Sequence, residues 1–172
     1  MKRFFPIWLL SLALLLFPAS IQGTEGEFEQ EFTEACELWK VPPKLALAIA
    51  RQESGLNPWA VNVSGQGYMF KTREDALKMI DSAWTNGDSF DTGLMQINSY
   101  WLRRFRLDPH LVLEPRNNII LGVWILSKEI ERFGLTWQAV ASYHTPVERN
   151  PERGRNYAAS VIRQMTSSNI ER

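Results

Sequence analysis

The chain has 172 residues, and its 19 lysines and arginines balance its 19 aspartates and glutamates. This length suits one domain with a substantial core, and a balanced charge without a lysine-rich run argues against a nucleic-acid partner. Cys36 is the only cysteine in the sequence, which excludes an internal disulfide and leaves a buried thiol or a bond to another chain as alternatives.

The first 23 residues have the pattern of a secretory signal. Two positive charges precede an almost wholly apolar run over 4–17, and small or turn-forming residues lead to a cleavage site that we place after Gly23. The run is short for a membrane span, and an uncleaved anchor is the alternative. We therefore predict a periplasmic protein without a membrane span after cleavage, whose mature domain is 24–172.

Helical and strand patterns alternate in the first half of the mature chain. Apolar spacing predicts a helix over 28–39, and a pair of prolines opens a second helix over 45–54 that ends before Gly55. Alternating residues over 59–63, a glycine-containing turn and a return over 68–70 predict a small β-hairpin.

Helices dominate the second half. They are expected at 72–84, 100–105, 116–133, 137–144 and 156–165. A loop or short extended piece is expected at 89–93 and a polar loop at 146–154. The chain contains no internal repeat or linker, so the predicted fold class is mainly α (α+β) in a single domain.

Glu53 is the candidate catalytic acid. On a helix, Ala50, Ile49 and Ala46 lie three, four and seven residues before it, so its carboxyl shares their apolar face. Apolar surroundings raise the pKa of a carboxyl, and such an acid stays protonated near neutral pH and can give its proton away. The alternative is a helix-end glutamate that reaches water or caps a neighbour.

Asp91 is the preferred second carboxylate. Two carboxylates that flank a glycosidic bond are the usual apparatus for its cleavage, and the candidates are Asp81, Asp88 and Asp91. Asp91 lies two residues before Gly93, where the backbone can approach a ligand closely. The alternative is a turn aspartate that bonds to its own backbone.

The sequence lacks the residues that several other classes of enzyme require. His110 and His144 with one cysteine make no metal-ligand set, and the chain contains neither a Gly-x-Ser-x-Gly elbow nor a glycine-rich phosphate loop. We expect no metal and no cofactor. The many aromatic residues suit either a well-filled core or a groove that stacks on sugar rings.

Four pieces of the chain together resemble the lytic transglycosylases of the soluble-lytic-transglycosylase type. In chain order they are Glu53-Ser54 with Asn57-Pro58, Gly93-Leu94-Met95-Gln96-Ile97, Ala141-Ser142-Tyr143-His144, and Tyr157. The resemblance covers roughly 28–165 and is strongest to the small enzymes that accompany type III or type IV secretion or conjugation machines. In this chain 91–99 also resembles a segment of animal-type lysozymes.

The resemblance implies a lysozyme-like fold, with the small hairpin beside the active-site groove, and cleavage of peptidoglycan. Glu53 matches the single catalytic acid/base, which would protonate the glycosidic oxygen between N-acetylmuramic acid and N-acetylglucosamine. It would then take the proton of the muramic 6-hydroxyl and close a 1,6-anhydro ring without water. The Tyr143 hydroxyl would face Glu53. The residues matched to the substrate groove are Ser54, Met95, Gln96, Tyr143, His144 and Tyr157.

Two departures from the family pattern leave alternatives open. His144 stands where the family commonly has asparagine, and it is either a polar neighbour of the site or a surface cap on the helix end. The insertion over 65–90 adds a helix beside the groove, which would shape substrate choice or dock a partner.

The orientation of Asp91 decides between two reactions. If it faces the sugar as an ionised carboxylate, hydrolysis as in lysozymes becomes possible. If it points away, Glu53 works alone as in the transglycosylases, which the form of 93–96 and the presence of Tyr143 favour. A non-catalytic peptidoglycan-binding scaffold is the third alternative. The expected partners of this monomer are a glycan strand and a secretion or conjugation machine.

Overall fold

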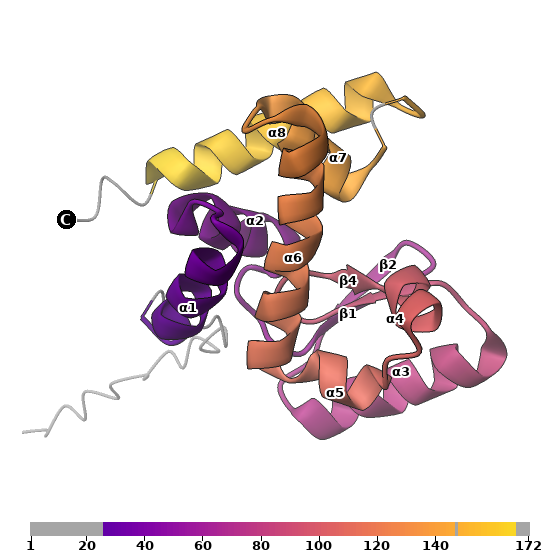
Figure 1. The fold of residues 1–172 in the computed structure, drawn as a ribbon. Helices are drawn as coiled ribbons and strands as arrows, with labels where there is room; N and C mark the ends of the chain where they lie inside the picture. Colours follow the sequence, from indigo (N-terminus) through magenta and orange to yellow (C-terminus); the bar gives the residue numbers. More distant parts are fainter. Residues whose placement is uncertain (1–25, 147, 168–172) are drawn as a thin grey trace, which may run out of the picture.

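The structure of the protein, a computed structural model, describes residues 26–146 and 148–167 (Figure 1). The signal predicted over 1–23 lies outside the described residues. Among the residues that are described, no helix is both long and apolar enough to cross a membrane. The protein is mainly helical with one small sheet, which confirms the predicted fold class.

Helices α1 (Glu29–Trp39) and α2 (Pro43–Ser54) confirm the first two predicted helices. Pro43 begins α2, where a missing N–H leaves no helical bond unmade. Gly55 ends the helix in the left-handed region with a φ of 60°. Cys36 on α1 is 1% exposed, which agrees with the buried-thiol alternative.

The sheet has four antiparallel strands in the order β2-β1-β3-β4. They are β1 (Ala60–Val63), β2 (Gln66–Met69), β3 (Phe90–Thr92) and β4 (Ile97–Asn98). The first two confirm the predicted hairpin, and the piece at 89–93 is largely strand. In the register of the sheet, Asp91 lies between Asn62 on one side and Asn98 on the other.

The remaining helices of the described residues are α3 (Arg73–Asn86), α4 (Ser99–Phe105), α5 (Pro109–Leu113), α6 (Pro115–Phe133), α7 (Trp137–His144) and α8 (Pro151–Ser167). Helix α5 was not predicted, because five residues are too few to show a helical period. The prediction of a loop over 146–154 is wrong in its second half. Asn150 accepts the N–H of Arg153 at 3.0 Å and caps a helix that already begins at Pro151.

Helix α6 runs through the centre of the molecule in Figure 1, with α1 and α2 along its left side, α7 and α8 at its upper end, and the sheet with α3, α4 and α5 at the lower right. Helix α3 packs on β1 and β3. It is also tied to the α5 region by Arg73–Glu114 and Asp81–His110, each at 2.7 Å. In Figure 1, α3 lies on the other side of the sheet from α7 and α8, and its expected position beside the groove stays a prediction.

Candidate active site

Glu53 lies in the last turn of α2, and its side chain is 12% exposed. Ala46, Ile49 and Ala50 are fully buried, so the carboxyl emerges from the apolar face that the spacing predicts. Burial raises the pKa of Glu53 to about 7, and the nearby charge of Asp91 acts in the same direction. Near neutral pH, a large share of this carboxyl is therefore protonated and able to donate a proton.

Two aromatic side chains reach the carboxyl from α7 and α8. The Tyr157 hydroxyl donates a hydrogen bond of 2.6 Å to Oε1 of Glu53. His144 stacks on Tyr157 with ring centroids 4.5 Å apart and ring planes 6° from parallel, and its Nδ1 lies 3.8 Å from the same Oε1. The structure thus places His144 beside Glu53, while Thr145 occupies the end of the helix.

The Gly-Leu-Met-Gln loop between β3 and β4 is held against α2 and β1 by side chains. The Ser54 hydroxyl donates to the carbonyl of Leu94 at 2.8 Å, which joins the end of α2 to the loop. The Gln96 amide donates to the carbonyls of Ala60 at 3.1 Å and Gly93 at 2.9 Å. Ser54 and Gln96 therefore hold the backbone of the loop in place next to Glu53.

The Tyr143 hydroxyl, which we expect to face Glu53, is bonded to the loop after β3. The hydroxyl donates to the backbone carbonyl of Met95 at 2.8 Å, and Tyr157 is the tyrosine that donates to the carboxyl. Tyr143 is still close to the site. Burial, followed by the charges of Glu53 and Asp91, raises the pKa of Tyr143 well above its usual value.

Asn118 on α6 shapes the site and was missed by the sequence analysis. It is fully buried. Its Oδ1 accepts the N–H of Met95 at 2.8 Å, and its Nδ2 donates to the carbonyls of Thr92 at 2.9 Å and Val112 at 3.1 Å. A Cβ on Gly93, whose φ is +80°, would overlap the Asn118 side chain. The available signal was an asparagine inside an apolar helix, where a buried amide needs partners.

Of the three candidate aspartates, Asp91 is the one whose charge acts on Glu53. Its Oδ1 accepts a hydrogen bond of 2.7 Å from Nδ2 of Asn98, and burial raises the pKa of Asp91 although this hydrogen bond opposes the effect. Asp81 instead has a side chain that is 58% exposed and bonded to His110. Asp88 follows the end of α3 at Gly87.

Comparison with known protein families finds that the Transglycosylase SLT domain matches residues 30–166. The chain belongs to this family. Membership supports a lysozyme-like fold and a function on peptidoglycan of the lytic transglycosylase type.

Several curated proteins are similar to this SLT domain. Invasion protein IagB of Salmonella typhi is 29% identical over 134 residues, which are 74% of this chain and 70% of that protein. Protein IpgF of Shigella flexneri is 27% identical over 136 residues, or 76% of each chain. A Peptidoglycan-binding-like protein of Escherichia coli O157:H7 is 29% identical over 157 residues, which are 87% and 84% of the two chains. No solved structure matches the chain.

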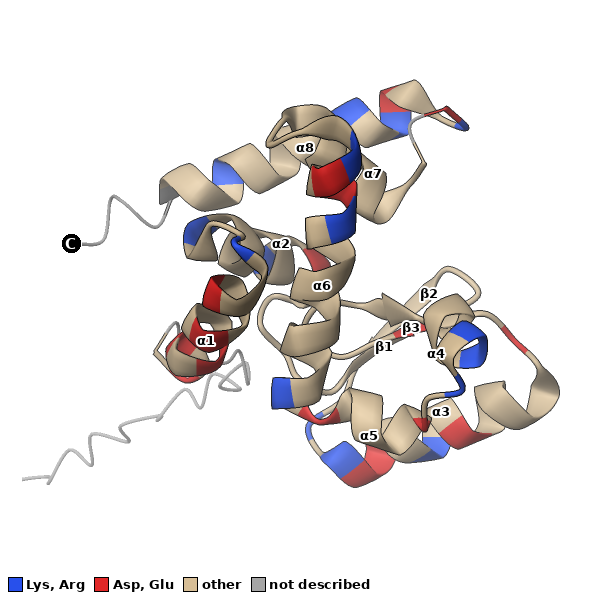
Figure 2. Cartoon of the chain, in the orientation of Figure 1, with Lys and Arg blue, Asp and Glu red and all other residues tan. Residues whose placement is uncertain are grey.

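Charges of both signs are spread over the SLT domain. Glutamates dominate α1, whereas lysines and arginines occur on α3, α4, α6 and α8 (Figure 2). Within 26–146 and 148–167, no group of three or more histidines, cysteines, aspartates or glutamates is placed to hold a metal ion.

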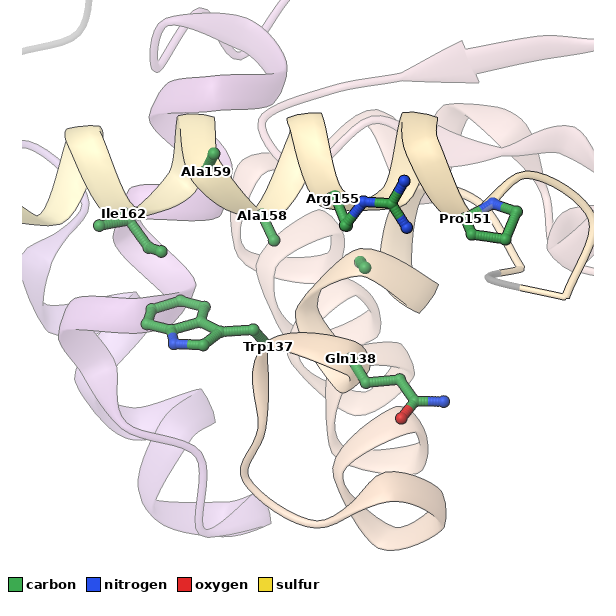
Figure 3. A pocket seen from close by; sticks show the side chains of 8 residues that line it. Trp137, Gln138, Pro151, Arg155, Ala158, Ala159 and Ile162 are labelled. Atoms are coloured by element: carbon green, nitrogen blue, oxygen red, sulfur yellow. The ribbon is translucent and has the colours of Figure 1, made fainter.

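A separate hollow of about 410 Å³ lies between α7 and α8 (Figure 3). Trp137 and Ile162 supply apolar surface on one side, and Arg155 and Pro151 lie towards the other end. The predicted site residues do not line this hollow. The candidate acid Glu53 therefore does not line the apolar hollow between α7 and α8.

Proposed function

We propose that the protein is a lytic transglycosylase that cleaves the β-1,4 bond between N-acetylmuramic acid and N-acetylglucosamine. Glu53 gives its proton to the glycosidic oxygen as the bond to the muramic C1 breaks. The resulting carboxylate takes the proton of the muramic 6-hydroxyl, whose oxygen bonds to C1 and closes a 1,6-anhydro ring. The observation that carries this proposal is the buried Glu53 carboxyl with a pKa of about 7.

The neighbours of Glu53 support both halves of this cycle. A carboxyl with a pKa near the ambient pH exchanges its proton readily in either direction. The Tyr157 hydroxyl steadies the carboxylate after proton transfer. Ser54 and Tyr143 bond to carbonyls of the loop, and we assign Ser54, Met95, Gln96, Tyr143, His144 and Tyr157 to the substrate groove.

The second candidate is hydrolysis of the lysozyme type, with Asp91 as the second carboxylate. The observation that favours it is that the Asp91 charge acts on Glu53. Against it, the Asp91 carboxylate is already engaged by the Nδ2 of Asn98 at 2.7 Å. We therefore propose that Glu53 works alone.

The setting of the reaction is also a proposal. We assign 1–23 to a cleaved signal peptide and 24–172 to a monomeric periplasmic domain. The similarity to Invasion protein IagB supports a role in opening the wall locally for a secretion or conjugation apparatus. The similarity to a Peptidoglycan-binding-like protein keeps a non-catalytic wall-binding scaffold as a third candidate.

Digestion of purified peptidoglycan by the wild type and by Glu53→Gln tests the proposal. We expect the wild type to release muropeptides that mass spectrometry identifies by 1,6-anhydro ends, and Glu53→Gln to release about 10³-fold less or none, because the amide carries no transferable proton. Reducing ends, heavier by one water, would support hydrolysis instead. Equal, negligible release by both proteins, with both sedimenting with peptidoglycan, would support the scaffold.

Thermal unfolding of Glu53→Gln is the control for folding. The pKa of Glu53 is higher in the folded protein than its ordinary value of 4.5, so its ionisation favours the unfolded chain. The resulting loss of stability begins as the pH rises above about 4.5 and is complete above about 7. At pH 8, Glu53→Gln should therefore unfold at a temperature no lower than the wild type.

A further inference from the structure

Arg153 contacts the active site through His144. Its Nε donates a hydrogen bond of 3.2 Å to Nε2 of His144. Arg153 lies in the first turn of α8, and its own backbone N–H is bonded to Oδ1 of Asn150 at 3.0 Å. This cap fixes the backbone of Arg153 one helical turn before Tyr157, whose hydroxyl donates to Glu53.

This hydrogen bond determines which nitrogen of His144 carries the proton. A guanidinium has donors and no acceptor, so Nε2 must accept with its lone pair. In a neutral imidazole the proton then lies on Nδ1. Nδ1 is the atom that faces Glu53, at 3.8 Å from Oε1. Arg153 thus donates to His144, and the N–H of His144 in turn points towards the Glu53 carboxyl.

We propose that Arg153 is a positioning residue for the acid/base Glu53: it holds His144 as the Nδ1–H tautomer, with a donor directed at the carboxyl. The catalytic meaning of this assignment rests on the proposed function, whereas the tautomer itself does not. His144 is further fixed by its stacking on Tyr157, which leaves its ring plane little freedom.

The direction of the donor matters because Glu53 changes charge during the reaction. At 3.8 Å, Nδ1 and Oε1 are too far apart for a hydrogen bond, and such contacts in free enzymes tighten when substrate binds. Once Glu53 has given up its proton, Nδ1–H is a second donor to the carboxylate beside the Tyr157 hydroxyl. The opposite tautomer would turn a lone pair towards that negative charge.

The groups around this pair come from four elements. Tyr157 and Arg153 approach from α8, Tyr143 precedes His144 on α7, Glu53 lies on α2, and the charge of Asp91 on β3 reaches Glu53. Burial, and then the positive charge of Arg153, lower the pKa of His144. Both effects favour the neutral imidazole on which the tautomer argument rests.

Two substitutions distinguish the effect of the Arg153 hydrogen-bond donor from the effect of its positive charge. In Arg153→Gln, the amide Nε2 occupies the same position along the side chain as the Nε of arginine, so a neutral donor is kept. Arg153→Met has a similar length and no donor. Arg155→Met is the matched control, because Arg155 lies on the same helix and lines the hollow between α7 and α8 instead (Figure 3).

Nitrogen-15 NMR of the histidine rings of the full chain, without substrate, tests the proposal. His110 and His144 are the two histidines of the sequence, and His144→Asn assigns the signals. We expect the Nδ1–H tautomer of His144 in the wild type, in Arg153→Gln and in Arg155→Met. In Arg153→Met we expect a shift towards the Nε2–H form, and in both Arg153 variants a higher His144 pKa, because the positive charge is gone.

Turnover on peptidoglycan adds the catalytic readout. Arg153→Met should lower kcat about tenfold with little change in KM, less than the ~10²-fold typical of removing a direct donor, and Arg153→Gln should restore most of it. An Nε2–H tautomer in the wild type, or an unchanged tautomer in Arg153→Met, would overturn the assignment whether or not the protein cuts peptidoglycan. A tautomer shift without any turnover in the wild type would contradict the proposed function and leave the assignment of the tautomer intact.

Discussion

Glu53 and Asp91 are two largely buried carboxyls that come from a helix and from a strand and have different surroundings. Glu53 leaves an apolar helix face and receives the hydroxyl of Tyr157. Asp91 lies in a strand and receives the amide of Asn98. Burial raises the pKa of both, to about 7 for Glu53. Helix α2 therefore supplies the acid, and strand β3 supplies a nearby charge that helps to keep it protonated.

Tyr157→Phe and Asp91→Asn should shift the pKa of Glu53 in opposite directions, and Tyr157→Phe should have the larger effect on turnover. The hydroxyl donates to the carboxylate and so lowers the pKa of Glu53. Its removal should raise that pKa and move the alkaline limb of the pH–activity profile to higher pH. Turnover should fall about tenfold, because the carboxylate formed after proton transfer loses a donor.

The control for this prediction is Tyr100→Phe. Tyr100 is 54% exposed, and its hydroxyl accepts from Arg104 on the same helix. We expect the wild-type profile for this variant. An alkaline limb that moves to lower pH in Tyr157→Phe would show that the hydroxyl does not stabilise the charged form of Glu53.

Asp91→Asn should give the smaller effect and the opposite sign. Loss of the negative charge removes an influence that raises the pKa of Glu53, so the alkaline limb should move to lower pH by less than about one unit. Turnover should change by less than about threefold if Glu53 works alone, measured as release of muropeptides over a range of pH.

Asp81→Asn is the matched control, since Asp81 on α3 is exposed and bonded to His110 on α5. It should leave the profile unchanged. A loss of about 10²-fold or more in Asp91→Asn, on the scale of a group that stabilises the transition state directly, would instead identify Asp91 as a second catalytic carboxylate that works with Glu53 in hydrolysis.

Local patterns were sufficient for the parts of the site that lie on one element. The apolar spacing before Glu53 placed its carboxyl on the buried face, and the prolines and Gly55 bounded its helix. The turn between 63 and 66 likewise predicts the hairpin. These features depend on neighbours in sequence, and the family pattern added the loop after Asp91.

Contacts between distant elements could not be predicted in the same way. The bond between Tyr157 and Glu53 joins residues 104 positions apart, and it depends on how α8 crosses α2. The resemblance implies that the Tyr143 hydroxyl faces Glu53, but it does not predict the hydrogen bond from Tyr143 to the Met95 carbonyl. The sequence analysis expects a loop at Arg153, whereas Pro151 is the first residue of α8, a position where proline is tolerated.

A carbon-13 titration of the glutamate carboxyls, with the Glu53 signal assigned by its absence in Glu53→Gln, tests the central claim most directly. We expect the wild-type signal to titrate with a midpoint of about 7. A midpoint near the ordinary value of 4.5 would mean that Glu53 is ionised at neutral pH, and it would contradict its assignment as the acid that cuts the glycan strand.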